Sequence, residues 1–281
     1  MAYKGVTADI GVFGGSGFYA FAEDIQDLLV ETPFGAPSDR ITIATVNDRQ
    51  LAFLPRHGRG HTLPAHAVNY RANIWALHSL GVRQIIAPFA CGSLRETVRR
   101  GDFVIVDQFV DRTRGREDTF FNGPETHHIG CADPYCPRLR QVAIEAAKEQ
   151  GIPVHETGTV VVIQGPRFST RAESHWFARN GWDVVGMTQY PECVLARELG
   201  ICYTGIALVT DYDAGLTIDT ATFETAETTE VVTVEMVLET MAKNTERVKE
   251  LIFAMAARLP EMPGKDSCPC AREAVAAIMN S

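Results

Sequence analysis

Residues 201–213, ICYTGIALVTDYD, indicate the fold class of this chain. The part 201–209 is a β-rich apolar run of the kind that is buried on both faces of a sheet. Similar runs precede it at 10–13, 41–46, 51–54, 84–90, 103–109, 159–163 and 183–185, and segments of helical period lie between them at about 68–80, 138–150, 170–180 and 191–199. This alternation predicts an α/β fold with the sheet at its centre.

A last long segment of helical period, 229–258, places Val234, Val237, Leu238, Val248 and Leu251 near one stripe. We expect it to pack as a helix against the sheet. With 281 residues, no internal repeat and no linker-like stretch, the chain is expected to form a single domain over 1–281. The core covers about 10–258, and 259–281 form a C-terminal tail with one short helix near 271–279.

Composition excludes several classes of function. The chain is 46% apolar and 22% charged, as ordinary globular proteins are, and its net charge of −9 comes without any basic block. A nucleic-acid partner is therefore not expected. No apolar run is long enough to span a membrane, and the N-terminus lacks the apolar region of a signal peptide. We expect a soluble, cytoplasmic protein with no membrane partner.

Seven cysteines, an odd number, are scattered along the chain and suit reduced thiols in a reducing compartment. Cys268 and Cys270 stand out because only a proline separates them, and such a pair can serve redox chemistry or bind metal. A zinc site needs two further ligands, and no second pair of this spacing is present. We therefore expect these two residues at the surface, and no metal.

A glycine-rich loop, Gly14-Gly15-Ser16-Gly17, follows the first expected strand. Its clustered backbone N–H groups and hydroxyl can hold a phosphate, although a tight turn is an equally good interpretation. It is not a P-loop, since no Gly-Lys-Ser/Thr follows. Gly15–Ala20 fits the loosest dinucleotide fingerprint, so a dehydrogenase is kept as an alternative. Against it, the next twenty or so residues show no second strand ending in an acidic residue.

A second candidate anion site lies in residues 54–61, LPRHGRGH, directly after an expected strand. The Arg56 guanidinium can bind phosphate oxygens in a bidentate manner, and His57 can add a hydrogen bond. His57 and His61 have the spacing of a helical zinc pair, but Gly58 and Gly60 disfavour a helix. A solvated basic turn is the alternative.

Two carboxylates, Asp211 and Asp213, leave the end of the 201–209 strand. Open α/β sheets bind their ligands at this end of the strands. Burial and mutual repulsion would raise the pKa of one carboxyl, which could then donate a proton near neutrality. A pair of aspartates in a turn or a helix cap is the structural alternative.

Taken in order, these motifs and four further ones resemble the methylthioadenosine phosphorylase branch of the trimeric purine nucleoside phosphorylases. The further motifs are 69–77 (NYRANIWAL), 165–173 (GPRFSTRAE), Met187-Thr188 and Pro191-Glu192. The resemblance covers about residues 10–258. It implies a single α/β domain with a mixed, partly barrel-like central sheet flanked by helices, the type I nucleoside phosphorylase fold.

The resemblance also implies a pentosyltransferase of purine and methionine salvage, active as a homotrimer with sites near the subunit interfaces. Its expected reaction is the phosphorolysis of 5′-methylthioadenosine to adenine and 5-methylthioribose 1-phosphate. Inorganic phosphate is a co-substrate, and no metal or organic cofactor takes part.

Site residues carry over by the same resemblance. The phosphate site would consist of Ser16, Arg56, His57, the Ala90 backbone and Thr188. The nucleoside would contact Phe168, Ser169, Met187, Val237 and Leu238, with His128 reaching in from a neighbouring subunit, and the catalytic Asp211 and Asp213 would face purine N7 and the 6-amino group. Two departures concern Phe89, where the family often has a phosphate-binding Thr, and Gln189-Tyr190, which are larger than usual.

Two further readings of the site stay open. A purine nucleoside phosphorylase acting on inosine, guanosine or methylthioinosine shares the fold and chemistry, whereas carboxylates facing the base favour the 6-amino group of adenine. No His follows His175, and an apolar wall at Val237 and Leu238 favours a thioether over a free 5′-hydroxyl. From another class, a nucleoside-binding protein without activity would need no phosphate loop.

Overall fold

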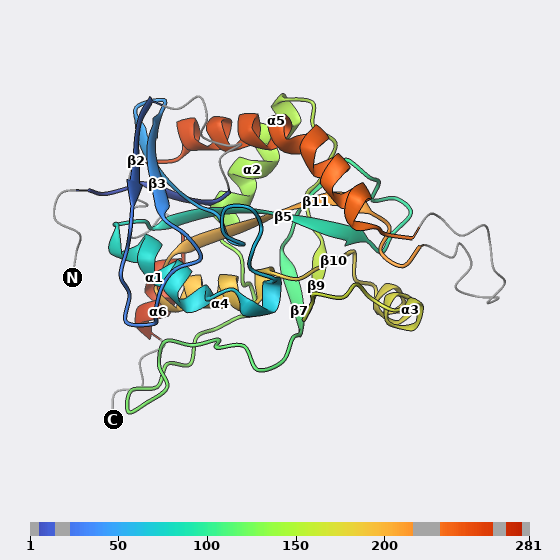
Figure 1. Cartoon of the computed structure of the whole chain (residues 1–281), viewed down its shortest axis with the longest axis horizontal. Coiled ribbons are helices and arrows are strands. Elements are labelled where there is room, and N and C mark those ends of the chain that lie inside the picture. Colours follow the sequence, from blue (N-terminus) through green and yellow to red (C-terminus); the bar gives the residue numbers. More distant parts are fainter. Residues whose placement is uncertain (1–5, 15–22, 216–230, 261–267, 277–281) are drawn as a thin grey trace.

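The computed structural model describes residues 6–14, 23–215, 231–260 and 268–276. Its strands form one mixed sheet of eleven strands (Figure 1). Four of them, β4 (Arg49–Leu54), β1 (Ile10–Phe13), β5 (Gln84–Ser93) and β11 (Cys202–Asp211), lie side by side and parallel in that order. Every residue of β1 and β11 is buried, which explains their continuous apolar sequences.

The sheet divides at β5, because this long strand pairs with three others. Its last residues pair antiparallel with β10 (Val184–Gly186), which continues in parallel to β9 (Thr159–Ile163) and β7 (Gln108–Arg112). On another side, β11 pairs antiparallel with β6 (Phe103–Ile105), and β6 pairs with β8 (Val154–His155). This confirms the expected α/β fold with a mixed central sheet.

The segment 103–109, expected as one strand, is in fact two strands that belong to different arms of the sheet. Asp107 lies between β6 and β7 and exchanges hydrogen bonds with Gly158, whose N–H donates to the Asp107 carboxylate at 2.9 Å. This contact redirects the chain from one arm to the other.

At the opposite edge, β3 (Ile41–Val46) pairs antiparallel with β4, and β2 (Glu23–Leu28) pairs antiparallel with β3. The neighbours of β1 are therefore β4 and β5, while β2 is an edge strand away from it. A dinucleotide-binding fold places its second strand in parallel beside the first. The dehydrogenase alternative is thus excluded by the strand order.

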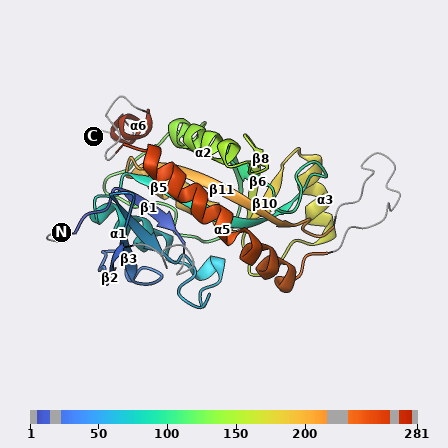
Figure 2. The same cartoon turned by 90° about the horizontal axis from the view of Figure 1, so that it is seen from above.

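Helices cover both faces of the sheet (Figures 1 and 2). On one face, α2 (Pro137–Glu149) and α5 (Val234–Arg258) pack against each other and against β11. On the other face lie α1 (Tyr70–Ser79) and α4 (Gln189–Glu198). The remaining helices are α3 (Arg171–Arg179) after β9, the short 3-10 helix η2 (Ala65–Ala67), and α6 (Cys270–Ala276) beside α4.

The apolar stripe of α5 divides into two halves. Val248 and Leu251 are fully buried, as expected, whereas Val234 and Leu238 are 62% and 63% exposed. In the first turns the buried positions are instead Met236 and Thr240. The N-terminal half of the helix therefore presents apolar side chains that the described part of the chain leaves exposed. In the described part of the chain, no helix has the length and apolarity that crossing a bilayer requires.

The described end of the expected tail packs against the body. Leu259, Cys268 and Cys270 are buried, and a Cβ at Gly200 would meet Ala271 of α6 at 3.2 Å. Arg197 of α4 also pairs with Glu273. The expectation that Cys268 and Cys270 lie at the surface was therefore wrong, because the sequence gives no sign that α6 folds back onto α4.

Candidate active site

The parallel strands β1, β4, β5 and β11 end at the same edge of the sheet, as the carboxyl ends of parallel strands do. Arg56 and His57 follow β4, and Asp211 ends β11. The strand β5 contacts both groups, and its residues 88–92 show where each group lies along the sheet edge.

Arg56 is held by a buried ion pair. Its Nε and Nη2 donate to the two carboxylate oxygens of Glu192 at 2.6 and 2.7 Å, and Nη1 donates to the Pro88 carbonyl at 3.1 Å. Its guanidinium lies 4.6 Å from the centre of the Phe13 ring. Burial acts to lower the pKa of Arg56, but the charge of Glu192 raises it above its usual range. Arg56 is therefore a fixed, permanently charged group.

A guanidinium carries five N–H donors. Three of them are used in the bonds to Glu192 and Pro88, so one on each terminal nitrogen has no partner in the described part of the chain. These two donors can bind a tetrahedral anion.

His57 is held as a neutral ring. Its Nδ1 lies 2.9 Å from the Leu63 carbonyl, which can only accept, so the proton resides on Nδ1 and Nε2 is left as an acceptor. Burial, followed by the charge of Arg56, lowers the pKa of His57 to about 4. His61 stacks on the ring at 4.4 Å. His57 can thus accept a hydrogen bond from a protonated oxyanion.

The turn after β10 brings Met187 and Thr188 to the same region. Val185 pairs with Gly92, and extending this antiparallel register by two residues places Met187 opposite Ala90. Thr188 is buried, and its hydroxyl has no partner among the described residues. An unpaired buried hydroxyl is costly unless a ligand completes its hydrogen bonding.

Arg116 fixes this turn from outside the predicted site. It donates to the carbonyls of Met187 at 2.8 Å, Tyr190 at 2.6 Å and Gln164 at 2.9 Å. Arg116 therefore joins the turn after β10 to the loop after β9, which carries Phe168 and Ser169.

Asp211 is a buried carboxyl. Its Oδ1 accepts from the Asp213 N–H at 2.7 Å, and its Oδ2 lies 2.6 Å from the Thr210 hydroxyl, which is itself 3.1 Å from the Cys91 carbonyl. Burial raises the pKa of Asp211 to about 6, although the bonds from Thr210 and Asp213 act against it. When Asp211 is protonated, the Thr210 hydroxyl can donate to the Cys91 carbonyl instead, which leaves the Asp211 proton available to a ligand.

Asp213 lies beside Asp211 in a left-handed backbone conformation, with φ of 51°. Burial raises its pKa, and the hydroxyls of Ser174 and Ser169 act against this rise. Its Oδ2 and the Ser169 hydroxyl form no hydrogen bond of normal geometry within the described residues. Both atoms are therefore available to a ligand.

The positions along β5 give the order of these groups. Arg56 contacts Pro88, and Asp211 pairs with Gly92. Four residues of strand separate these two positions, or about 13 Å. The anion-binding group and the carboxyl pair therefore lie at the same edge of the sheet, at two positions along β5.

Glycine at position 92 is required by this close approach. A Cβ there would lie 2.8 Å from Asp211 Oδ1 and 3.1 Å from the Asp213 backbone. Phe89, which departs from the family pattern, fills the space above another glycine, since a Cβ at Gly186 would meet its ring at 3.0 Å.

Other predicted residues are placed less centrally. Ser16 lies outside the described residues. Phe168 is 36% exposed, Val237 is partly buried and Leu238 is 63% exposed. The segment that leads into α5 contacts the carboxyl pair, because the Val232 N–H donates to the Asp213 carbonyl at 2.9 Å.

His128 is remote from the site within one chain. It is exposed on the loop that Arg197 holds through the Gly130 carbonyl, at the C-terminal end of α4. Thr188 is at the N-terminal end of the same helix, about 15 Å away along its axis. His128 therefore does not reach this chain's own site.

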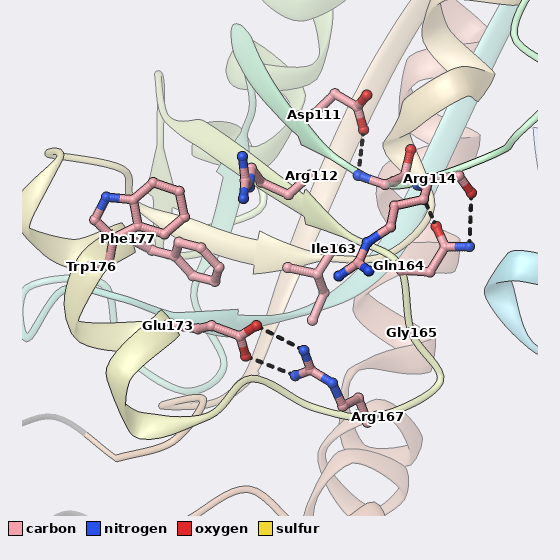
Figure 3. A pocket seen from close by; sticks show the side chains of 11 residues that line it. Asp111, Arg112, Arg114, Ile163, Gln164, Gly165, Arg167, Glu173, Trp176 and Phe177 are labelled. Atoms are coloured by element: carbon pink, nitrogen blue, oxygen red, sulfur yellow. Dashed lines mark hydrogen bonds and ion pairs between the residues drawn. The ribbon is translucent and has the colours of Figure 1, made fainter.

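A separate pocket of about 500 Å³ lies at the β7 edge, between β7, β9 and α3 (Figure 3). Arg167 forms two hydrogen bonds with Glu173, and the Arg112 guanidinium lies 4.7 Å from the Trp176 ring. None of the site residues predicted from the sequence lines it. Of the charged residues that line it, Arg167 and Glu173 pair with each other.

Sequence reasoning missed the roles of Glu192 and Arg116. Glu192 was part of a recognised motif, and its position four residues after Thr188 in an apolar helix is the signal that a buried acid needs a cation. Arg116 lies in a polar segment without periodicity, so nothing in its surroundings indicates that it bonds to four carbonyls.

Comparison with known proteins agrees with this geometry. The family model described as the phosphorylase superfamily matches residues 9–257. The chain is 49% identical to the S-methyl-5′-thioadenosine phosphorylase of Saccharolobus solfataricus, over 99% of this chain and 100% of that protein. It is also 49% identical to the purine nucleoside phosphorylase of Streptomyces coelicolor, over 96% of this chain and 95% of that protein.

Among solved structures, the methylthioadenosine phosphorylase of Schistosoma mansoni in complex with adenine superposes with a TM-score of 0.86. It shares 39% sequence identity with this chain, and the match covers 96% of this chain and 98% of the other. A methylthioadenosine phosphorylase from an antarctic soil metagenomic library gives a TM-score of 0.87 at 38% identity, covering 98% and 93% of the two chains.

The raised pKa of Asp211 predicts a pH-dependent cost in stability. Because burial raises the pKa from 3.8 to about 6, the folded state favours the protonated carboxyl. That contribution is present below about pH 4, is lost as the pH rises through about 6, and amounts to at most about 3 kcal/mol. The melting temperature of Asp211→Asn, measured relative to that of the wild type, should therefore be higher at about pH 7.5 than at about pH 4.5.

Asp133→Asn is the control for this measurement, since Asp133 is exposed. It should follow the wild type at both pH values. An Asp211→Asn variant whose melting temperature also follows the wild type would show that this carboxyl ionises as freely as an exposed one.

Proposed function

The chain is a member of the phosphorylase superfamily, and we propose that it cleaves 5′-methylthioadenosine with inorganic phosphate, giving adenine and 5-methylthioribose 1-phosphate. It is an enzyme of the pentosyltransferase type. The observation that supports the proposal is that a fixed guanidinium, Arg56, and a carboxyl with raised pKa, Asp211, contact the same strand, β5, four residues apart.

The phosphate end is formed by groups that can hold an oxyanion from several sides. Arg56 offers two N–H donors, Thr188 a buried hydroxyl, and His57 an acceptor for a phosphate hydroxyl. The Ala90 backbone and Ser16 are proposed to add further contacts, by the resemblance noted above. Charge-assisted bonds of this kind orient phosphate for attack on the sugar.

Bond cleavage places positive charge on the sugar and negative charge on the departing purine. Phosphate stabilises the sugar cation and then forms the new bond to its anomeric carbon, while the bond to the purine breaks. Asp211, protonated up to about pH 6, donates its proton to N7, so that adenine leaves as a neutral base. No step needs a metal or an organic cofactor.

Choice of base depends on the carboxyl pair. Asp213 Oδ2 has no protein partner among the described residues and can accept a hydrogen bond from the 6-amino group of adenine. A 6-oxo group in that position would turn its lone pairs toward the carboxylate. Phe168 and Ser169 are proposed to line the purine, and Met187, held by Arg116, to contact the ribose.

A purine nucleoside phosphorylase acting on inosine or guanosine is the second candidate. One observation favours it: the Streptomyces coelicolor relative of that name is as similar to this chain as the Saccharolobus solfataricus relative is. Both candidates share the phosphate end, so they differ only in the base and in the 5′ substituent.

We further propose a homotrimer in the cytoplasm. The exposed apolar side chains of Phe168 and Leu238 lie beside the site, where a neighbouring subunit would cover them and bring His128 to the 5′ end of the nucleoside. All seven cysteines are free thiols, which suits a reducing compartment.

An assay of base release tests both the phosphorolysis reaction and the preference for a 6-amino purine. Purified protein should release adenine from 5′-methylthioadenosine only when phosphate is present, and should act on inosine at least about tenfold less well, because its 6-oxo group leaves Asp213 unpaired. Asp211→Asn should lower turnover more than about tenfold, as general acid catalysis contributes about 100- to 10,000-fold. Equal rates with inosine would favour the second candidate, and phosphate-independent release would contradict phosphorolysis.

Replacing Arg56 by lysine tests the phosphate contact, because lysine keeps the positive charge but lacks the planar guanidinium with its paired N–H donors. Arg56→Lys should raise the KM for phosphate about tenfold or more, since losing one charge-assisted hydrogen bond costs about 1.5–3 kcal/mol. The KM for the nucleoside should change less. Arg59→Lys is the matched control, because Arg59 lies on the same loop but pairs with Asp27 and Asp39. If both variants showed the same modest change, Arg56 would not bind phosphate.

A further inference from the structure

Three segments that are far apart in the sequence bring four cysteines together. Cys136 caps the N-terminus of α2, Cys202 begins β11, and Cys268 and Cys270 come from the C-terminal segment. All four are buried, and their sulfur atoms lie within 4.8 Å of one another. We call this group the cysteine cluster. The second pair of thiols that Cys268 and Cys270 lack in the sequence is supplied by the fold.

The surroundings of the cysteine cluster suit negatively charged sulfur. Arg138 Nη2 lies 3.7 Å from Cys202 Sγ and also donates to Gln84 Oε1 at 2.7 Å. An apolar pocket of packed thiols would need no guanidinium beside it, whereas thiolates do.

Backbone N–H groups point to the same chemistry. Cys136 is the N-cap residue of α2, so its sulfur lies beside the helix N-terminus, where the backbone N–H groups carry a partial positive charge. A partial positive charge of this kind stabilises a thiolate relative to a thiol.

The distances fit a tetrahedral ion. Zinc binds thiolates at about 2.3 Å, which separates the sulfurs of a tetrahedral site by about 3.8 Å. In this structure the sulfurs of Cys202 and Cys268 are 3.1 Å apart, and the largest separation in the cluster is within 4.8 Å. The cysteines are free thiols and provide four ligands, the number that structural zinc sites have.

We propose that the cysteine cluster is a tetrathiolate site for a structural zinc ion. Binding replaces four thiol protons, which pass to solvent, and leaves a site of net charge −2 that Arg138 and the start of α2 partly offset. The ion would fasten the C-terminal segment to α2 and β11, together with the ion pair between Arg197 and Glu273.

The site is structural because it is far from the reaction. Cys202 begins β11 and Asp211 ends it, so nine residues of strand, or about 30 Å, separate the cluster from the carboxyl pair. Four protein ligands also leave no open position for a substrate.

Metal analysis of the intact chain tests the proposal without any activity assay, so its outcome is independent of the proposed function. Protein expressed with added zinc and purified with a reductant but no chelator should contain about one zinc per chain. Replacing zinc by cobalt should give the visible absorption of a tetrahedral tetrathiolate site. Cys268→Ser should hold less than about a tenth as much zinc, whereas Cys131→Ser, an exposed cysteine outside the cluster, should still hold about one ion.

A strong chelator should lower the melting temperature of the wild type toward that of Cys268→Ser. Phosphorolysis by Cys268→Ser, measured where the variant is folded, should stay within about twofold of the wild type, because no ligand position faces the substrate. Two results would overturn the proposal: reduced protein that contains no zinc although it was expressed with added zinc, or disulfide bonds within the cluster in place of metal.

Discussion

The buried ion pair between Arg56 and Glu192 determines where an anion can bind in this fold. Both side chains are almost fully buried, and removing two charges from water is costly unless their hydrogen bonds are complete. Glu192 receives two bonds from Arg56 and a third from the Tyr203 hydroxyl at 2.7 Å. The pair thereby joins β4, α4 and β11 and leaves the guanidinium in one orientation, with its remaining donors directed to a ligand.

The carboxyl pair, Asp211 and Asp213, differs from Arg56 in that no ion pair stabilises its charge among the described residues. Asp211 and Asp213 are buried without a cationic partner of the kind that Arg56 gives Glu192, and burial raises the pKa of both carboxyls. A carboxyl kept partly protonated near neutrality can donate a proton, which a salt-bridged one cannot do. A permanent cation and a carboxyl with raised pKa thus contact β5 at positions about 13 Å apart along the strand. Phosphorolysis of a nucleoside needs this combination, because opposite charges develop on the sugar and the base.

Much of this arrangement was accessible from the sequence. Strands such as 10–13 and 159–163 are apolar enough to be recognised, and Arg56 and Asp211 follow strands whose ends meet in a parallel sheet. The strand β2, EDIQDL, was missed because edge strands carry charges that hide their periodicity. The cysteine cluster was missed for another reason: its members are brought together by the path of the chain, and no local pattern encodes that path.

A crystal structure with both phosphate and adenine bound would test the central claim most directly. The account predicts phosphate within hydrogen-bonding distance of Arg56 and Thr188, and adenine in the same site with N7 toward Asp211 and its 6-amino group toward Asp213. Phosphate bound elsewhere, for example at Arg112 and Arg167 in the pocket beside β7, or adenine bound away from both aspartates, would contradict it.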